Sequence, residues 1–326
     1  EKIGKSGANI GFININNFNY IIKTFKFKKP KNPFNQSNNC LKLFTPYNEI
    51  IQNILVSNIV QFLNKKERVI FRRFNFADNI LKLEYFGLDD NTTYIINKQV
   101  GMTYESNYYT NLGELFKNHY LQLLNKTFKE EKYHIIDLFL RFLTEKLNHY
   151  FKFLRLLNKK IGYINTDLKC VNVFIKETPL NSAMLKKYKL LLDNGFILNY
   201  TLLVSDLDKS TMKINQTSFM PNEDKLLEKL LSRTNTRLST IYHFRYNCLK
   251  DKNYCMRFKP YHFDRITLYY DIYILFYTKI YKTQKFNSLD EYYSYLGKLN
   301  NYVMKSLNID KDEFKLFYER INNSFF

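Results

Sequence analysis

Hydrophobic and polar residues alternate in the first part of the chain, a pattern typical of β-strands. The alternation is interrupted at Asn16 and Asn17, a polar pair that predicts the turn of a hairpin. Further on, short runs of β-branched and aromatic residues predict more strands before Gly101. The predicted strands of this β-rich region lie at residues 12–15, 20–25, 81–86 and 94–96.

One helix is expected inside the β-rich region. Thr45 and Pro46 supply an N-cap residue and a first helical residue, and isoleucine and leucine follow at helical spacing up to Ile59. Glu49 is the only carboxylate of this predicted helix. The basic, polar stretch that precedes it, at residues 26–39, is expected to be an insertion.

From about Gly113 onward the hydrophobic pattern becomes helical. Residues 134–157 place large apolar side chains on one helical face, which predicts the central helix of an α-rich region. Strands are predicted again at 173–175 and 201–204, and a Lys-rich stretch near 186–189 is expected to form a hairpin on the surface.

These patterns predict an α+β fold with two domains. Hydrophobic residues make up 45% of the 326 residues, which is enough to bury a sizeable core. The predicted division is a small β-rich N-terminal domain at residues 1–100 and a larger α-helical domain at residues 101–326.

The composition narrows the partners that the chain can bind. Lys and Arg number 50 against 30 Asp and Glu, so the net charge of +20 favours nucleic acid, acidic protein, phosphate or an anionic membrane surface. An A/T-rich coding sequence would also explain the excess of lysine. The four cysteines form no CxxC pair and the five histidines form no HExxH motif, which argues against a disulfide framework and structural zinc and favours a reducing compartment. No apolar run reaches the ~20 residues of a membrane span, so no transmembrane segment is expected.

A polar loop follows the long predicted helix and carries the candidate chemistry. It presents Asp167, Lys169 and Asn172 immediately before a strand, and the strand at 201–204 ends next to Asp206. Carboxylate and amide oxygens are the ligands that Mg²⁺ prefers, while its remaining positions go to water and phosphate. These residues therefore predict a magnesium-dependent phosphate site.

The motifs are similar to those of a known family. Asp167-Leu168-Lys169-Cys170-Val171-Asn172 resembles the D-L-K-x-x-N catalytic loop of protein kinases, and Asp206-Leu207-Asp208 resembles their D-F-G element. Ile21-Ile22-Lys23 is similar to V-A-I-K, and Gly4-Lys5-Ser6-Gly7 to the glycine-rich loop that precedes it. The motifs occur in the family's order. Their departures most resemble the divergent serine/threonine kinases of poxvirus virions or of a related large DNA virus.

The resemblance implies a bilobal kinase fold, with a β-rich N-lobe and a helical C-lobe. It also implies transfer of the ATP γ-phosphoryl group, with Mg²⁺ or Mn²⁺, to Ser or Thr of protein substrates, acidic proteins among them. Asp167 would orient the substrate hydroxyl and accept its proton, and Lys169 would neutralise the transferring group. Asn172 and Asp206 would hold the metal ion. Such a kinase would work inside the host cytoplasm or in the virion.

Other roles implied by the resemblance concern the phosphates of ATP. Lys23 would pair with the α- and β-phosphates and would itself be braced by Glu49. Backbone N–H groups around Gly4, Ser6 and Gly7 would cover the phosphates. The separation of 49 − 23 = 26 residues between Lys23 and Glu49 requires the insertion at 26–39. Taken alone, Lys23 would more often be a lysine at the edge of a sheet.

Some positions depart from the kinase pattern or have a simpler reading. Asn165 replaces the usual His of the catalytic loop, whose packing contributes rigidity. Thr166 replaces the usual Arg, which suggests a kinase that activation-loop phosphorylation does not switch on. Asp208 replaces the glycine of D-F-G. Asp271 lies in an otherwise apolar segment and would, by resemblance, bond the backbone of the catalytic loop. Its alternative is a partly exposed helix aspartate.

Three other functions stay open from the sequence. A pseudokinase would keep the fold and the motifs without the activity. A small-molecule phosphotransferase shares the spacing of Asp167 and Asn172, although it commonly has His where Lys169 stands. A nucleic-acid-binding protein is favoured by the net charge of +20 and by residues 25–29, which interleave aromatic and basic side chains.

Overall fold

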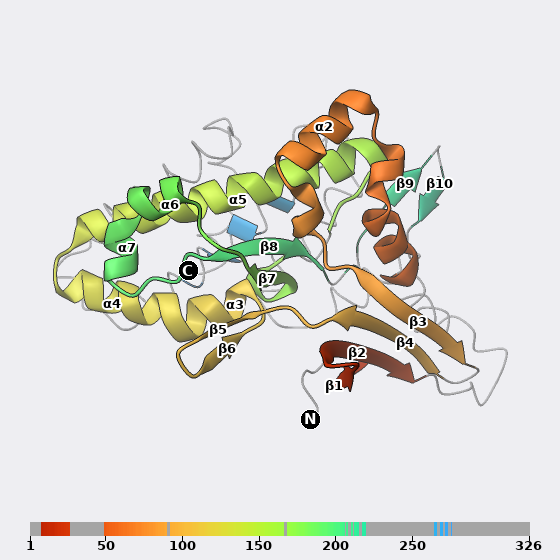
Figure 1. The fold of residues 1–326 in the computed structure, drawn as a ribbon, viewed down its shortest axis with the longest axis horizontal. Coiled ribbons are helices and arrows are strands. Elements are labelled where there is room, and N and C mark those ends of the chain that lie inside the picture. The colour runs from red at the N-terminus through yellow and green to blue at the C-terminus, as the bar shows by residue number, and fades with distance from the viewer. Residues whose placement is uncertain are drawn as a thin grey trace, which may run out of the picture. The chain divides into compact units, whose positions relative to one another are not determined.

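The computed structural model describes most of the chain up to residue 205 and short pieces beyond it. The described ranges are 8–26, 49–89, 92–165, 168–205, 212–214 and 217–219, with the single positions 207, 210, 264, 265, 268, 269, 271, 272 and 275. Helices and a small antiparallel sheet occur together in these ranges (Figure 1), which confirms the predicted α+β class.

The N-terminal strands form one four-stranded antiparallel sheet in the order β1-β2-β4-β3. Asn16 and Asn17 join β1 to β2, and their φ angles of 51° and 65° are the left-handed values that a tight hairpin turn requires. The hairpin and its turn are therefore confirmed where the sequence pattern predicts them. The strands are β1 Ala8–Ile15, β2 Phe18–Lys26, β3 Leu83–Asp89 and β4 Thr92–Lys98.

A helix at residues 49–57 packs against one face of this sheet. Side chains alternate along a strand, so Lys23 and Phe25 of β2 lie on the same face of the sheet, and Phe25 contacts the helix. The predicted start of the helix at Thr45 and Pro46 lies outside the described residues. The core between helix and sheet consists of Phe25, Ile50 and Ile95, with Leu83 packed against them.

Short helices connect this helix to β3, and the sequence pattern predicts none of them. Among them, α2 begins with a capping box, in which Asn64 Oδ1 accepts a hydrogen bond from Glu67 N (2.9 Å) and Glu67 Oε2 accepts one from Asn64 N (3.1 Å). The buried Phe71 of α2 packs against Phe76 and Phe153, with ring centroids 5.9 and 6.3 Å away. The elements are η1 Ile59–Phe62, α2 Lys65–Arg73 and η2 Phe76–Asn79.

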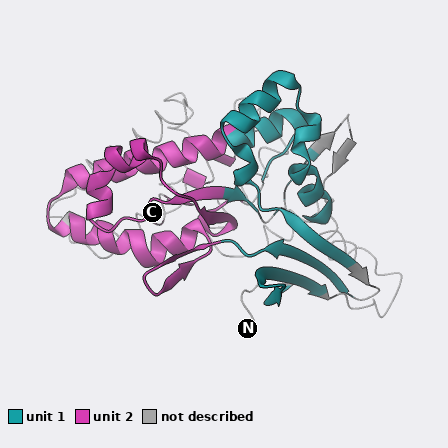
Figure 2. Ribbon diagram, viewed as in Figure 1, with its two compact units in different colours: residues 1–100, 153–167, 203–229 teal, residues 101–152, 168–202, 230–326 magenta. Residues whose placement is uncertain are grey.

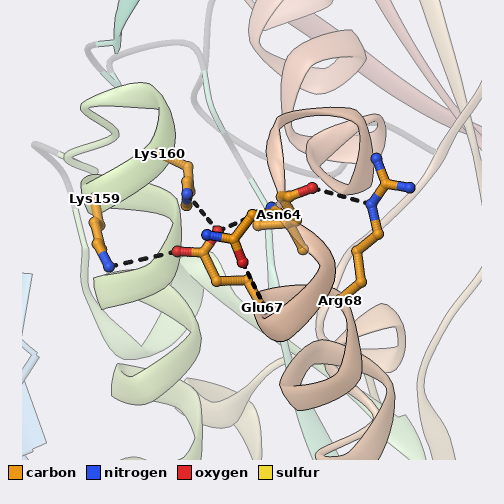
Figure 3. Close-up of polar contacts among 6 residues, drawn as sticks. Asn64, Glu67, Arg68, Lys159 and Lys160 are labelled. Carbon is orange, nitrogen blue, oxygen red and sulfur yellow. Dashed lines mark hydrogen bonds and ion pairs between the residues drawn. The ribbon is translucent and has the colours of Figure 1, made fainter.

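Glu67 also joins α2 to the last turn of α5 (Tyr133–Ile161), as Figure 3 shows. Its Oε1 lies 3.4 Å from Lys159 Nζ, and its Oε2 forms an ion pair with Lys160. The hydrogen bond from Lys160 lowers the pKa of the Glu67 carboxyl below its ordinary value of 4.5. The contact of Phe71 and these ion pairs together hold α2 against α5.

A Glu67→Gln variant is expected to lose about 1 kcal/mol of unfolding free energy at pH 7. Because the pKa of Glu67 is lowered in the folded protein, its contribution is complete above pH 4.5 and is lost as the pH falls through the folded-state pKa. Urea unfolding of both proteins at pH 7 and at progressively lower pH measures the difference. A difference that does not shrink below pH 4.5 would contradict this reading.

The long helix α5 contains the predicted helix at 134–157. The predicted strands at 173–175 and 201–204 are present as β7 and β8, which pair with each other. The remaining described elements are β5 Met102–Tyr104, β6 Asn107–Tyr109, α3 Leu112–Leu115, the π-helical turn η3 Phe116–Tyr120, α4 Leu121–Lys129, η4 Cys170–Asn172, β7 Val173–Glu177, α6 Ser182–Lys187, α7 Lys189–Asp193, β8 Tyr200–Val204, β9 Met212–Ile214 and β10 Thr217–Phe219.

The hairpin predicted near residues 186–189 is wrong, because this stretch forms the two short helices α6 and α7. Asn181 caps α6 by accepting a hydrogen bond from Met184 N (2.9 Å). Tyr188 and Leu191 are fully buried and anchor the helices through apolar contacts. The exposed lysines at 186, 187 and 189 misled the prediction, since exposed lysines say little about the backbone.

Two compact units make up the chain (Figure 2). Unit 1 contains residues 1–100, 153–167 and 203–229, and unit 2 contains 101–152, 168–202 and 230–326. The long helix α5 therefore contributes its first part to unit 2 and its last turns to unit 1. Within the described ranges, no helix combines the length and the apolarity that crossing a membrane requires.

Candidate functional site

Lys23 and Glu49 form an ion pair inside unit 1. Lys23 Nζ lies 2.8 Å from Glu49 Oε2, although the two residues are 26 positions apart in the sequence. Their side chains are only 16% and 6% exposed. The pair that the resemblance implies is therefore present, and both charges are largely withdrawn from solvent.

The sheet explains why Lys23 occupies this position. Strand β2 lies between β1 and β4, and Lys23 is in register with Ile10 on one side and Ile95 on the other. Lys23 is therefore on a central strand, and the alternative reading of an edge lysine is wrong. A buried ammonium group is costly unless it is paired. Glu49, the only carboxylate of the predicted helix, supplies that partner.

A second polar link ties helix 49–57 to the segment that follows Asp206. Gln52 is fully buried one turn after Glu49, and its Nε2 donates a hydrogen bond to the backbone carbonyl of Ser210. Ser210 in turn donates from its backbone N and its Oγ to the carbonyl of Leu207, each at 3.0 Å. The helix that carries Glu49 is thus held to Ser210 and, through it, to Leu207.

The chain is also fixed just before Asp206. Val204, the last residue of β8, forms a parallel bridge with Ile80, and its carbonyl accepts a hydrogen bond from Leu81 N at 3.1 Å. Ser205 and Leu207 are only 2% and 1% exposed. Asp206 itself lies outside the described residues, but the positions on either side of it are anchored within unit 1.

In unit 2 the loop that resembles a catalytic loop is anchored by Asp271. Its Oδ2 accepts a hydrogen bond from Cys170 N at 2.6 Å, across 101 positions of sequence. Burial and the nearby Asp271 carboxylate raise the pKa of the Cys170 thiol. Asp271 therefore bonds the backbone of the loop, and it is at the same time a partly exposed helix residue, so the two readings of this aspartate both describe it.

The rest of this loop is closely packed. Leu168, Cys170 and Asn172 are 2%, 0% and 7% exposed, and Asn172 N donates to the carbonyl of Lys169 at 2.9 Å. Helix α3 lies against the same loop through Gly113, which has no side chain to keep the loop away. A Cβ at Gly113 would stand 2.7 Å from Val171 Cγ1 and 3.0 Å from Val171 N.

Gly113→Ala is therefore expected to destabilise the protein by about 1–2 kcal/mol, because the added methyl group overpacks the loop by more than alanine gains in helix propensity. Chemical denaturation measures the loss, and faster hydrogen exchange at the Cys170 amide would locate it. Gly11→Ala is the control, since its Cβ would meet Ile22 Cγ2 at an ordinary 3.4 Å. Equal stability of the two variants would contradict the close contact.

The structure describes some of the predicted site residues and not others. It brings Lys23 to Glu49 in unit 1 and the loop of Lys169 and Asn172 to Asp271 in unit 2. The residues that lie outside the described ranges are Gly4, Ser6, Gly7, Asp167, Asp206 and Asp208. The roles that the sequence assigns to all of these residues stay predictions.

Sequence reasoning missed Gln52 and Ser210. The available signal was a glutamine one turn after Glu49 on a helix that is otherwise rich in isoleucine and leucine, since a polar residue in that position needs a partner. Gly113 gave no signal beyond its small size. Among the described residues, no group of three or more His, Cys, Asp or Glu is placed to hold a metal ion.

The chemistry open to these groups is limited. A largely buried ammonium group that is fixed by one carboxylate can bind a phosphate oxygen, and a rigid loop can position polar groups without reorganisation.

In comparisons with known proteins, no protein-family model matches this chain, and no curated protein sequence matches it either.

Proposed function

We propose that the protein is an ATP-dependent protein kinase with a bilobal fold, which transfers the γ-phosphoryl group to Ser or Thr hydroxyls. The observation that carries the proposal is the ion pair between Lys23 on a central strand and Glu49 on the adjoining helix, at 2.8 Å. In kinases a strand lysine and a helix glutamate must form this pair for the lysine to bind phosphate.

Two further contacts support the proposal. The D-L-K-x-x-N loop is tied through Cys170 N to Asp271, which is the bond that the resemblance implies for an aspartate at this place. The strand β8, which leads to Asp206, is hydrogen-bonded to residues 80–81. A strand that presents a metal ligand needs to be fixed in this way. Both contacts join residues far apart in the sequence.

The proposed reaction gives each of these groups one role. The substrate hydroxyl oxygen attacks the γ-phosphorus, the bond between the γ-phosphorus and the β–γ bridging oxygen breaks, and ADP leaves. Asp167 takes the hydroxyl proton, while Lys169 neutralises the γ-phosphoryl oxygens. Lys23 binds the α- and β-phosphates. Because Lys23 is held by Glu49, its charge needs little reorganisation when the transition state forms.

The residues present fit a magnesium ion that is bound together with ATP. Mg²⁺ takes one or two protein oxygens and fills its remaining positions with water and phosphate, so a cluster of three carboxylates is not required. Asn172, which is 7% exposed, and Asp206 would hold the ion. When bound, it would neutralise the negative charge of the phosphates.

Incubation with γ-³²P-labelled ATP, Mg²⁺ and casein tests the proposal. We expect label on the protein substrate, and phosphoserine or phosphothreonine after acid hydrolysis. Saturable ATP binding without transfer would identify a pseudokinase instead, and label on small hydroxyl compounds alone would identify a small-molecule phosphotransferase. Salt-sensitive DNA binding with no ATP binding would favour a nucleic-acid-binding protein. Each of these three outcomes contradicts the proposal.

A further inference from the structure

The outward face of α2 carries an uncompensated group of positive charges. The helix contains five cations and one carboxylate, Glu67. Its inner side is occupied by Phe71, which packs against Phe76 and Phe153. The remaining side chains on the outer side, including Lys65, Lys66, Arg72 and Arg73, are exposed.

Glu67 cannot neutralise these cations, because it points to the other side of the helix. Its carboxylate is already bound by Lys159 and Lys160 of α5 and by the backbone N of Asn64, and its side chain is only 12% exposed (Figure 3). Within the part of the chain that the structure describes, no carboxylate forms an ion pair with any cation on the outer face. Like charges three or four positions apart on a helix repel one another. An anionic partner would relieve that repulsion.

The outer face also contains an apolar centre. Val69 is 61% exposed, the highest value of any large apolar side chain among the described residues. On an α-helix its surface neighbours are the residues three and four positions before and after it. All of these neighbours are cations, namely Lys65, Lys66, Arg72 and Arg73. We call these five residues the α2 surface.

We propose that the α2 surface binds an acidic protein segment in which an apolar side chain lies between carboxylates. The apolar side chain contacts Val69, and the carboxylates pair with the surrounding cations, of which Arg72 and Arg73 can each bind a carboxylate with two hydrogen bonds. The interaction is separate from phosphotransfer and needs no ATP. For a kinase, it would recruit acidic substrates or an acidic regulator.

Two other anionic partners fit the α2 surface less well. A nucleic acid presents hydrated phosphates, and the aliphatic side chain of Val69 has no flat face on which a base could stack. A membrane-surface helix buries a continuous apolar face in the lipid. In α2 Phe71 is buried, Ile70 and the adjoining Phe74 are each 40% exposed, and Val69 has cations at the positions three and four before and after it, so the cations interrupt any apolar face.

Fluorescence anisotropy with the full chain tests the proposal without ATP. The probe is a labelled peptide of ten residues in which a leucine is flanked by glutamates, and a second probe has serine in place of the leucine. The double variant Arg72→Gln/Arg73→Gln is expected to weaken binding of the leucine peptide about tenfold. The matched control, Lys186→Gln/Lys189→Gln, removes the same charge from exposed positions on α6 and α7 and should leave binding unchanged.

A third variant, Val69→Ser, keeps every charge and removes the apolar centre. It should weaken binding of the leucine peptide and leave that of the serine peptide unaltered. Circular dichroism confirms that each variant is folded. Absence of peptide binding, or equal weakening by the α2 and control variants, would overturn the proposal. So would tighter binding of a duplex DNA or of phosphatidylserine vesicles through the same arginines, because the occupant would then be of another class.

Discussion

Glu49→Gln should nearly abolish phosphotransfer and lower the free energy of unfolding by about 3 kcal/mol. The substitution removes the carboxylate that lies 2.8 Å from Lys23 Nζ and leaves a largely buried ammonium group without it. Without the carboxylate, the Lys23 side chain is no longer oriented toward the phosphates. We therefore expect the rate of transfer to fall by about 10²-fold or more. Initial rates with labelled ATP and urea unfolding measure the two effects.

A double variant separates stability from activity. Lys23→Met/Glu49→Leu replaces the ion pair with apolar side chains and should regain most of the lost stability, because no unpaired charge is left in the core. It should stay inactive, since the cation that binds the α- and β-phosphates is gone. The control is Glu145→Gln, which breaks the exposed pair with Lys187 and should cost less than 1 kcal/mol with no change in rate. An active double variant would refute the role of Lys23.

Gln52→Leu is expected to give the second-largest effect. The Gln52 amide donates the hydrogen bond that links helix 49–57 to Ser210. Substitution by leucine leaves the Ser210 carbonyl without this donor. We expect a loss of about 1–3 kcal/mol and a fall in kcat, because Glu49 and the segment after Asp206 are no longer held together. The readout specific to this link is hydrogen exchange, which should become faster in residues 50–57.

The matched control for this variant is Gln61→Leu, which replaces an exposed glutamine of η1. It should leave both the rate and the exchange pattern unchanged. If Gln52→Leu lowers stability while kcat and exchange in the helix stay as in the unmodified protein, the link is structural only and does not position Glu49.

The sequence predicts elements whose pattern is local and regular. Strands β1 and β2 follow from alternation on either side of Asn16 and Asn17, residues that tolerate the left-handed backbone of the turn. Helix α5 follows from a long stripe of apolar residues. The pairing of Lys23 with Glu49 was implied by the resemblance to kinases, since no local pattern joins two residues 26 positions apart.

Elements set by distant contacts could not be predicted in the same way. Gln52 bonds a backbone carbonyl 158 positions away, and a carbonyl gives no sequence signal. Helix α2 has few apolar residues, and its position depends on Phe71 meeting Phe153 of α5. The helices α6 and α7 depend on the burial of Tyr188 and Leu191. In each case the tertiary contact decides the local structure.

We propose that the loop beginning at Asp167 catalyses phosphate transfer, and one paired measurement tests this role most directly. Incorporation of ³²P from γ-labelled ATP into casein is followed for the unmodified protein and for Asp167→Asn, with thermal unfolding as the check that both are folded. We predict that the variant keeps its stability and its affinity for ATP but transfers phosphate about 10²–10⁴-fold more slowly. Equal incorporation by the two proteins would contradict the assignment of the catalytic loop.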